Sequence, residues 1–323
     1  MIMNQKKNNV KVSLWRDRPI LSFSDKQIMK KNVFPSGRQA LTAALCHMGL
    51  DRSSRVAVPE WSSHCVLSAI AKVATPIPIK EVVNCSISVD SILLYSQWGW
   101  TPNIDWTEYH SIFGDIPVIC DEVDSAHMLD ESMPYIQAHY EVRSLSKTLG
   151  LKSGGLLKYN GKYVEFTSDK NHKNLDITGF TDVNTIVRNT FLKAEKIYLD
   201  EEVDIWLDNN DVSAALLHES RLRRCNVKNI IDSHLASTWK EWMIQSFNRG
   251  IAPGLVPLYI GYDRNDLLKI KSELARTFNI ETSIYHFNIS ECPWVVDYKQ
   301  CLAFPVHGLN NKVEEIIQFL KYE

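Results

Sequence analysis

The chain has 323 residues, 45% of them hydrophobic and 23% charged, and its formal net charge is −2. This length fits two domains or one large α/β unit, and the near-neutral charge gives no indication of binding to nucleic acid or to an anionic membrane. No segment reaches about 18 uninterrupted apolar residues, and the N-terminus has no apolar run of signal-peptide length, so we expect a cytoplasmic protein. The seven scattered cysteines include no Cys-x-x-Cys pair. They predict reduced, mostly buried thiols, and neither disulfides nor a metal site.

The first clear element is a helix that begins at Ser36. Residues 1–32 before it are polar and mixed, and we interpret them as an N-terminal arm. Ser36 and Gln39 have the spacing of a capping box, and the helix ends at Gly49. The first turn of such a helix presents free backbone N–H groups and the positive end of the helix dipole. It could therefore hold a phosphate, although a capped helix without a ligand is the commoner case.

Strands and helices alternate from there to about residue 163. Apolar runs predict strands at 55–59, 76–79, 91–95, 116–120 and 155–159, and periodic runs predict helices at 65–73 and 105–113. Asn160-Gly161 has the composition of a hairpin turn. This alternation predicts an α/β fold with a mostly parallel sheet that is covered by helices on both faces.

The pattern becomes helical from about Asn184. We predict helices at 212–225 and 230–247, and we place the basic cluster Arg221–Arg224 on a solvated helix face. A smaller α+β unit follows, with strands at 256–260, 282–287 and 301–304 and helices at 266–278 and 311–321. We therefore expect a large domain at residues 1–205, followed by linking helices and a small C-terminal domain at residues 206–323.

Lys147 is the most informative single residue. It follows two hydroxyl side chains, Ser144 and Ser146, and precedes the glycine pair Gly154-Gly155. The serines can donate hydrogen bonds to an anion, and the glycines allow backbone to pass close to a bulky group. A lysine amine beside an anion site suits a Schiff base with a phosphorylated aldehyde, which indicates pyridoxal 5'-phosphate (PLP).

Two acidic residues follow the strand predicted at 116–120. In open α/β sheets ligands bind at the carboxyl ends of strands, so Asp121 and Asp124 both lie where a cofactor would bind. PLP needs a carboxylate on its pyridine nitrogen. Asp124 begins Asp-Ser-Ala-His, in which Ala126 is small enough for a flat ring to lie against it. For either aspartate alone, a helix cap or an exposed loop acid would be the favoured interpretation.

Several segments occur in an order and spacing found in one enzyme family. Ser36-Gly-Arg-Gln-Ala-Leu is similar to a phosphate turn Ser-Gly-Thr-x-Ala-Leu, and Asp124-Ser-Ala-His to Asp-Ala-Ala-His/Gln. Lys147 and Gly154-Gly155 keep the lysine-to-glycine spacing, and Cys301-Leu-Ala-Phe-Pro-Val-His307 is similar to Cys-Leu-x-Leu-Pro-x-His. On these residues the chain resembles the DegT-type sugar aminotransferases, which are fold-type-I PLP enzymes. The resemblance covers most of residues 33–323.

The resemblance implies a role for each matching residue. Lys147 would form the Schiff base and move the proton, and Asp124 would pair with the pyridine nitrogen. Ser36, the backbone of Gly37 and Arg38, and Ser144 would hold the phosphate. Further cofactor contacts would come from Ala126, His127, Trp61, Ser63 and Asn209. Asn209 would act from a neighbouring subunit, which implies a homodimer with shared active sites. His307 is assigned no role beyond support of its loop.

The sequence departs from the family pattern at several positions. Arg38 replaces a phosphate-binding threonine, although arginine also pairs with phosphate. The aromatic residue that should stack on the cofactor falls at Ser63, which leaves Trp61 or His64 to cover that face. Asp211 stands where an arginine is usual.

The leading hypothesis is amino transfer from an amino acid, glutamate in our interpretation, to a keto group on a nucleotide-linked sugar. We expect burial beside a cationic cofactor to lower the pKa of Lys147. The altered Ser63 and Asp211 leave room for dehydration, racemisation or tailoring of a non-sugar metabolite with the same cofactor. A third possibility is a non-catalytic protein that kept the fold.

Overall fold

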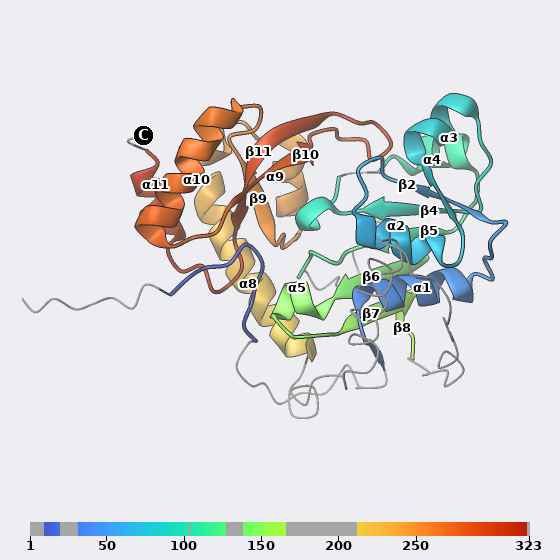
Figure 1. Cartoon of the computed structure of the whole chain (residues 1–323). Helices are drawn as coiled ribbons and strands as arrows, with labels where there is room; N and C mark the ends of the chain where they lie inside the picture. Colours follow the sequence, from blue (N-terminus) through green and yellow to red (C-terminus); the bar gives the residue numbers. More distant parts are fainter. Residues whose placement is uncertain (1–9, 20–31, 103, 127–137, 166–211, 322–323) are drawn as a thin grey trace, which may run out of the picture.

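The protein forms two lobes, each built around its own β-sheet (Figure 1). The computed structural model describes residues 10–19, 32–102, 104–126, 138–165 and 212–321, and all statements below concern these residues. The boundary predicted at residues 205 and 206 lies outside them.

The large lobe contains a sheet whose centre is parallel. Five parallel strands occur in the order β3-β2-β4-β5-β6, and the antiparallel β7 and β1 extend the sheet beyond β6. A short β8 pairs with β7 and closes the hairpin predicted at Asn160-Gly161. The strands are β1 (Val33–Phe34), β2 (Arg55–Val58), β3 (Thr75–Pro78), β4 (Ser91–Tyr95), β5 (Val118–Asp121), β6 (Tyr140–Ser144), β7 (Gly155–Tyr159) and β8 (Lys162–Tyr163).

Helices cover both faces of this sheet, as its almost continuously apolar strands require. Leu93 of β4 packs in a hydrophobic cluster with residues of α1 and α2. Its neighbours Ile92 and Leu94 point to the other face, into a cluster with residues of α3 and α4. The helices of this lobe are α1 (Gly37–His47), α2 (His64–Ala71), α3 (Ile79–Cys85), α4 (Trp106–Phe113) and α5 (Leu145–Leu149). The prediction of a mostly parallel sheet between helices is confirmed.

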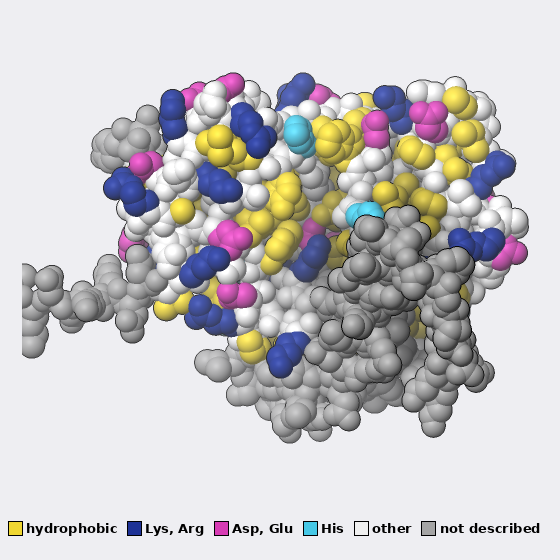
Figure 2. Space-filling view, viewed as in Figure 1, with side chains coloured by type: hydrophobic (Ala, Val, Ile, Leu, Met, Phe, Trp, Pro, Cys, Tyr) yellow, Lys and Arg dark blue, Asp and Glu magenta, His cyan; other side chains and the backbone are white. Residues whose placement is uncertain are grey.

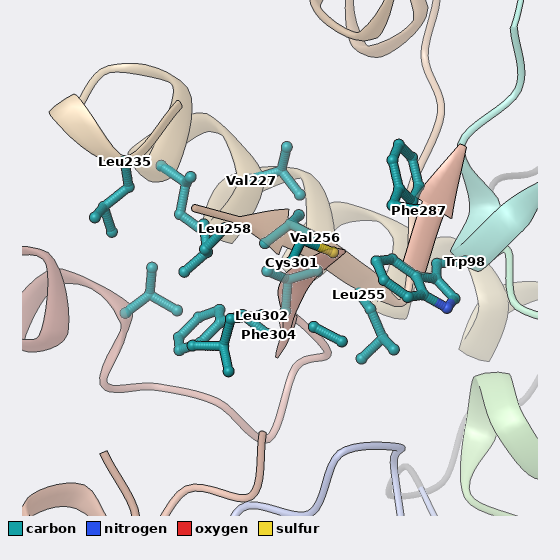
Figure 3. Close-up of a cluster of buried hydrophobic side chains, with 14 of the residues drawn as sticks. Trp98, Val227, Leu235, Leu255, Val256, Leu258, Phe287, Cys301, Leu302 and Phe304 are labelled. Atoms are coloured by element: carbon teal, nitrogen blue, oxygen red, sulfur yellow. The ribbon is translucent and has the colours of Figure 1, made fainter. Parts of the chain in front are cut away.

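The C-terminal lobe has an antiparallel sheet in the order β10-β11-β9. Its core joins β9, β11 and α8, through residues such as Val256, Phe304 and Val227 (Figure 3). Trp98 approaches from the large lobe and packs against Phe287 with ring centroids 5.1 Å apart, which fastens the two lobes together. The elements are α8 (Val212–Ile231), α9 (Glu241–Asn248), β9 (Leu255–Leu258), α10 (Arg264–Phe278), β10 (Ser283–Asn288), β11 (Tyr298–Pro305) and α11 (Val313–Phe319).

Helix α8 corrects the prediction of two helices at 212–225 and 230–247. It continues without a break to Ile231, because Val227 and Ile230 extend its buried stripe past Cys225. The chain breaks only after Asp232, where the Ser233 hydroxyl accepts a hydrogen bond from the backbone N–H of Leu235 and caps a short 3-10 turn. Helix α8 begins beside α5 and ends in the C-terminal lobe, so it connects the two lobes (Figure 1).

Two further expectations need correction or addition. All seven cysteines are free, but the prediction that most are buried is wrong: only Cys120 and Cys301 are buried, and four are exposed. Helix α3 follows β3 directly and was not predicted from the sequence.

The surface and the helices give two observations that bear on partners. Within the part of the chain that the structure describes, no helix is long and apolar enough to cross a membrane. On the face shown in Figure 2, basic and acidic side chains are interspersed over the C-terminal lobe, in keeping with the net charge of −2.

Candidate active site

Three adjacent parallel strands end at the same edge of the large sheet and bring the predicted catalytic residues together. Tyr95 ends β4, Asp124 follows the end of β5, and Lys147 follows β6 on α5. The Lys147 Nζ donates to Asp124 Oδ1 at 2.8 Å, and the Tyr95 hydroxyl donates to Asp124 Oδ2. The carboxylate of Asp124 is thus bound at both oxygens by groups from the neighbouring strands.

The direction of Lys147 is set by the short helix α5. Leu145 and Leu149 lie four residues apart and pack into a buried cluster with Val212 and Leu216 of α8. Lys147 lies between them in sequence and therefore points to the opposite side, toward Asp124. The Thr148 hydroxyl donates to the carbonyl of Ser144 at 2.7 Å and helps to close the turn. The lysine is held by apolar packing behind it.

The electrostatics of the site are dominated by the pairing of Lys147 with Asp124. Burial disfavours the charged amine, but pairing with Asp124 outweighs this and raises the pKa of Lys147. The predicted lowering concerns Lys147 beside a cationic cofactor, and it stays a prediction. Burial and the neighbouring Asp124 raise the pKa of Asp121 to about 7. Burial, together with the charge of Asp124, raises the pKa of Tyr95, so its hydroxyl stays protonated and donates.

The residues of the predicted phosphate site come from the start of α1 and from the end of β6. Ser36 caps α1 through its hydroxyl, which accepts from the backbone N–H of Gln39 at 3.2 Å. Gly37 lies beside Ser144: an added Cβ would stand 3.4 Å from the Ser144 Cβ. The Ser144 and Ser146 hydroxyls are 2.9 Å apart. The helix N-terminus and two hydroxyls therefore converge on one side of the lysine.

The glycine pair lies where β7 passes the start of α1. A Cβ on Gly155 would come within 2.3 Å of the carbonyl oxygen of Ser36, so the backbone of β7 can run along the start of α1 only without a side chain there. The backbone N–H of Gly154 donates to Pro35 at 2.8 Å. The glycines therefore allow β7 to pass close to the start of α1, where the phosphate site is predicted.

The remaining predicted cofactor residues differ in burial and in their contacts. Ala126 is completely buried next to the Asp124 loop. Trp61 is 59% exposed and packs against His286 and Tyr298 of the C-terminal sheet, with centroids 5.4 and 5.5 Å apart. Ser63 is exposed at the start of α2, and its hydroxyl lies 3.0 Å from the thiol of Cys65. The side chain of Arg38 is exposed on α1. His127, Asn209 and Asp211 lie outside the described residues.

The basic cluster on α8 contributes a residue to the back of the site. Arg223 is completely buried, which overturns our placement of the whole cluster on a solvated face. Its guanidinium donates to Glu219 Oε1 at 2.8 Å, to the carbonyl of Asp124 at 2.9 Å and to the carbonyl of Thr148 at 3.2 Å. One side chain thus ties together the loop of the carboxylate and the helix of the lysine.

Glu219 extends this support to the N-terminal segment and to the turn after β11. It accepts from Arg16 at 2.8 Å and from the backbone N–H of Gly308 at 3.2 Å. His307 in the same turn donates from Nε2 to the carbonyl of Ser13 at 2.8 Å. Burial lowers the pKa of His307 to about 4, so it is neutral at pH 7. Support of its loop was the expected role, and the structure shows the contact through which His307 acts.

Comparisons with known proteins agree with this arrangement. A family model described as "Putative PLP-dependent aminotransferase" matches residues 26–320, which is nearly the whole chain. The chain belongs to this family of PLP-dependent aminotransferases. No curated protein matches the sequence.

Solved structures with the same fold include aminotransferases with bound cofactor. NtdA from Bacillus subtilis, with bound PMP, has a TM-score of 0.56 and 15% identity over 90% of this chain and 72% of that chain. "Putative sugar aminotransferase Spr1654" from Streptococcus pneumoniae, in its PLP form, has a TM-score of 0.55 and 13% identity over 95% and 97%. A DegT DnrJ EryC1 StrS aminotransferase from Brucella abortus has a TM-score of 0.52 and 15% identity over 90% and 84%. The fold-type-I resemblance is confirmed.

The residues of this PLP-dependent aminotransferase fit its cofactor. Asp124 is a buried carboxylate, and the side chain of Lys147 beside it is 39% exposed, so it can be reached by an aldehyde. The amides at the start of α1, which have no partner within the helix, suit a phosphate. Asp121 was the other acid that the sequence offered as a partner of the ring nitrogen. The Lys147 amine donates to Asp124 and not to Asp121. Its carboxylate accepts from the backbone N–H of Val123 instead.

Sequence reasoning missed several residues around the aminotransferase site, among them Tyr95, Cys65 and Arg223. Tyr95 gave a usable signal, because it ends a strand next to that of Asp124. Cys65 lies near enough to Lys147 to contribute to its raised pKa, and its place in the first turn of α2 after a buried strand was a weaker signal. Arg223 gave none, because nothing in the local sequence distinguishes it from Arg221 or Arg224.

Proposed function

We propose that this enzyme moves the amino group of an amino acid, glutamate in the first instance, to a keto group on a nucleotide-linked sugar. The proposal rests on one observation above all: the amine of Lys147 and the carboxylate of Asp124 form a 2.8 Å pair that is open to solution from the lysine side. PLP carries a ring nitrogen that pairs with a carboxylate and an aldehyde that reacts with an amine. PLP can therefore take the place of Lys147 as the partner of Asp124, through its ring nitrogen, and the place of Asp124 as the partner of Lys147, through its aldehyde.

The residues have separate tasks in this proposal. Lys147 would hold the cofactor covalently, and its amine would carry the proton between the substrate carbon and the cofactor. Asp124 keeps the ring nitrogen protonated, and Tyr95 fixes the carboxylate by its hydrogen bond. Ser36, Ser144 and the backbone amides of Gly37 and Arg38 hold the phosphate. When bound, PLP supplies a ring that accepts the electrons of the substrate carbanion.

Further cofactor contacts belong to the same proposal. Ala126 would lie against the ring and His127 beside it, with Ser63 near the position of the stacking residue. Asn209 of a second copy would reach the phosphate, which makes the enzyme a homodimer that we place in the cytoplasm. Trp61 packs on the C-terminal sheet, so any contact that it makes with the ring requires it to leave His286 and Tyr298.

The test follows both halves of the reaction with the protein loaded with PLP. Glutamate should convert the cofactor to its amine form and release one equivalent of 2-oxoglutarate. A keto sugar nucleotide should then restore the aldehyde form and carry the nitrogen. Lys152→Ala changes an exposed lysine five residues from Lys147. It is the matched control for Lys147→Ala and should behave as the wild type.

Two other results would replace the proposal. Exchange of the substrate hydrogen with solvent, without release of 2-oxoglutarate, would indicate racemisation. Release of water or ammonia from the substrate, with the cofactor unchanged, would indicate a dehydratase. The observation that favours these alternatives is the exposed Ser63, whose side chain cannot stack on a ring.

A further inference from the structure

Trp15 places an aromatic face at the reactive lysine. The Lys147 Nζ lies over the Trp15 ring, 5.0 Å from its centroid. The edge of the same ring lies on Gly254, where an added Cβ would come within 2.9 Å of the Trp15 Cζ3 and 3.0 Å of the carbonyl oxygen of Asp124. The indole therefore occupies a position beside both members of the ion pair.

The segment that carries Trp15 is fixed on both sides of it. On one side Val12 pairs with the chain at Ile280, and the Ser13 carbonyl accepts from His307 at 2.8 Å. On the other side the buried Arg16 donates to Glu219 at 2.8 Å. Residues 10–19, which belong to the arm interpreted from the sequence, therefore line one side of the site.

Contact with α5 fixes the segment relative to the lysine itself. Gly150 ends α5 with φ +71°, and a Cβ there would lie 2.4 Å from the carbonyl oxygen of Arg18. The backbone three residues after Trp15 thus touches the end of the helix that carries Lys147. The distance between the indole and the amine is set by packing at two points, so it does not depend on the cation–π contact alone.

We propose that Trp15 contacts the group bonded at Lys147 and selects acceptors that carry a ring. The face of an indole is electron-rich and apolar, and it attracts the slightly positive C–H groups of a flat or puckered ring. A sugar ring with deoxy positions offers such a face, and a small keto acid does not. Ser63 stands where the family resemblance places an aromatic and carries no ring, whereas Trp15 supplies an aromatic face from a different segment.

The first test concerns the position of Trp15 and does not require turnover. Addition of PLP to the cofactor-free protein should perturb the ultraviolet absorption of an indole next to Lys147. Trp15→Phe should lose this difference band, and Trp106→Phe, which changes a half-buried tryptophan on α4, should keep it. The same band in Trp15→Phe as in the wild type would overturn the inference.

The second test concerns selectivity, and this part rests on the proposed function. Trp15→Leu keeps apolar volume but removes the aromatic face, so KM for a keto sugar nucleotide should rise by about three- to tenfold. KM for 2-oxoglutarate should stay within about twofold, and Trp15→Phe should recover most of the sugar affinity. An equal loss for both substrates in Trp15→Leu would mean a structural role only and would overturn the selectivity.

The two tests also separate this inference from the proposed function. A wild-type protein that accepts no keto sugar contradicts the proposed function, while the difference band still decides whether Trp15 faces the bound group. Thermal unfolding of each variant identifies one that is misfolded, and in that case the milder Trp15→Phe carries the comparison.

Discussion

Two buried carboxylates, Asp124 and Glu219, belong to residues that Arg223 links, and each carboxylate holds a cation at 2.8 Å. The two ion pairs differ in what surrounds the cation. The Lys147 side chain that pairs with Asp124 is 39% exposed. The Arg223 side chain that pairs with Glu219 is 1% exposed, and both carboxylates have no exposure. One pair is open to solution from one side, and the other is closed.

The partners beyond each pair make the same distinction. Arg223 donates to backbone carbonyls of Asp124 and Thr148 as well as to Glu219, and its buried guanidinium has no open side from which a ligand could approach. Lys147 has Asp124 as its hydrogen-bond acceptor and water within reach, so its partner can be exchanged. The comparison shows how the two kinds of ion pair can be told apart. In the reactive pair the cation is accessible to solvent, and in the structural pair the cation is buried and fully hydrogen-bonded.

Asp124→Asn should show the largest effect and should act on the reaction more than on the fold. Loss of the carboxylate charge should lower turnover by about 10³-fold. It should also lower the pKa of Lys147, because Asp124 is the main group that raises it. The unfolding free energy should change much less than in Glu219→Gln, since the lysine can reach water. Turnover and urea unfolding of the same preparation test both points, and a folded but fully active variant would contradict them.

Glu219→Gln should act mainly on the fold. Removal of this charge leaves the buried Arg16 and Arg223 without their carboxylate, which should lower the free energy of unfolding by roughly 3 kcal/mol or more. The control is Asp232→Asn on the same helix, where the exposed pair with Lys228 should contribute less than about 1 kcal/mol. Equal effects of the two substitutions would contradict the distinction between closed and open pairs.

His307 should make the closed network sensitive to acid. Its pKa is lowered from 6.5 to about 4 in the folded protein, so the unfolded chain binds a proton first as the pH falls. The free energy of unfolding should therefore fall by up to about 3 kcal/mol between pH 6.5 and pH 4, and this contribution should be constant above and below that range. His307→Gln should flatten the pH dependence in this window. Parallel curves for the wild type and the variant would show that His307 is not responsible.

Tyr95→Phe should have the smallest effect. It removes one hydrogen bond to the Asp124 carboxylate, so cofactor affinity should fall by about tenfold, equivalent to about 1.4 kcal/mol. Tyr109→Phe is the control, because its hydroxyl bonds to the carbonyl of Ile116 outside the site at 3.3 Å. Equilibrium titration with PLP measures the cofactor affinity of both variants. An unchanged affinity in Tyr95→Phe would show that Tyr95 does not contribute to cofactor binding.

The open pair could be predicted from the sequence, and the closed pair could not. Lys147 and Asp124 lie in short segments directly after strands, and parallel topology brings such segments to one edge of a sheet. Asp121 satisfies the same criterion, and the choice of Asp124 came from the family resemblance. The alternation of strands and helices was equally local and predicted the large sheet. The start of α1 at Ser36 was predicted from its capping residues alone.

The closed pair depends on packing between segments far apart in the chain. Arg16 and Glu219 are 203 residues apart in sequence, and Glu219 looked like one acid among several on a polar helix. The prediction that the basic cluster is solvent-exposed was wrong for Arg223. Periodicity distinguishes the faces of a helix, but it does not show which charged residues a neighbouring lobe buries. The break between the predicted helices at 225 and 230 failed for a similar reason, because the stripe through Val227 and Ile230 packs in the C-terminal core.

The central claim is that the amine of Lys147 is the group that bonds PLP. Borohydride reduction of the PLP-loaded protein, followed by proteolysis and mass spectrometry, shows which lysine carries the cofactor. The account predicts the added mass on the peptide that contains Lys147 and its loss in Lys147→Ala, with Lys152→Ala unchanged. The added mass on another lysine in the wild-type protein, with Lys147 unmodified, would contradict it.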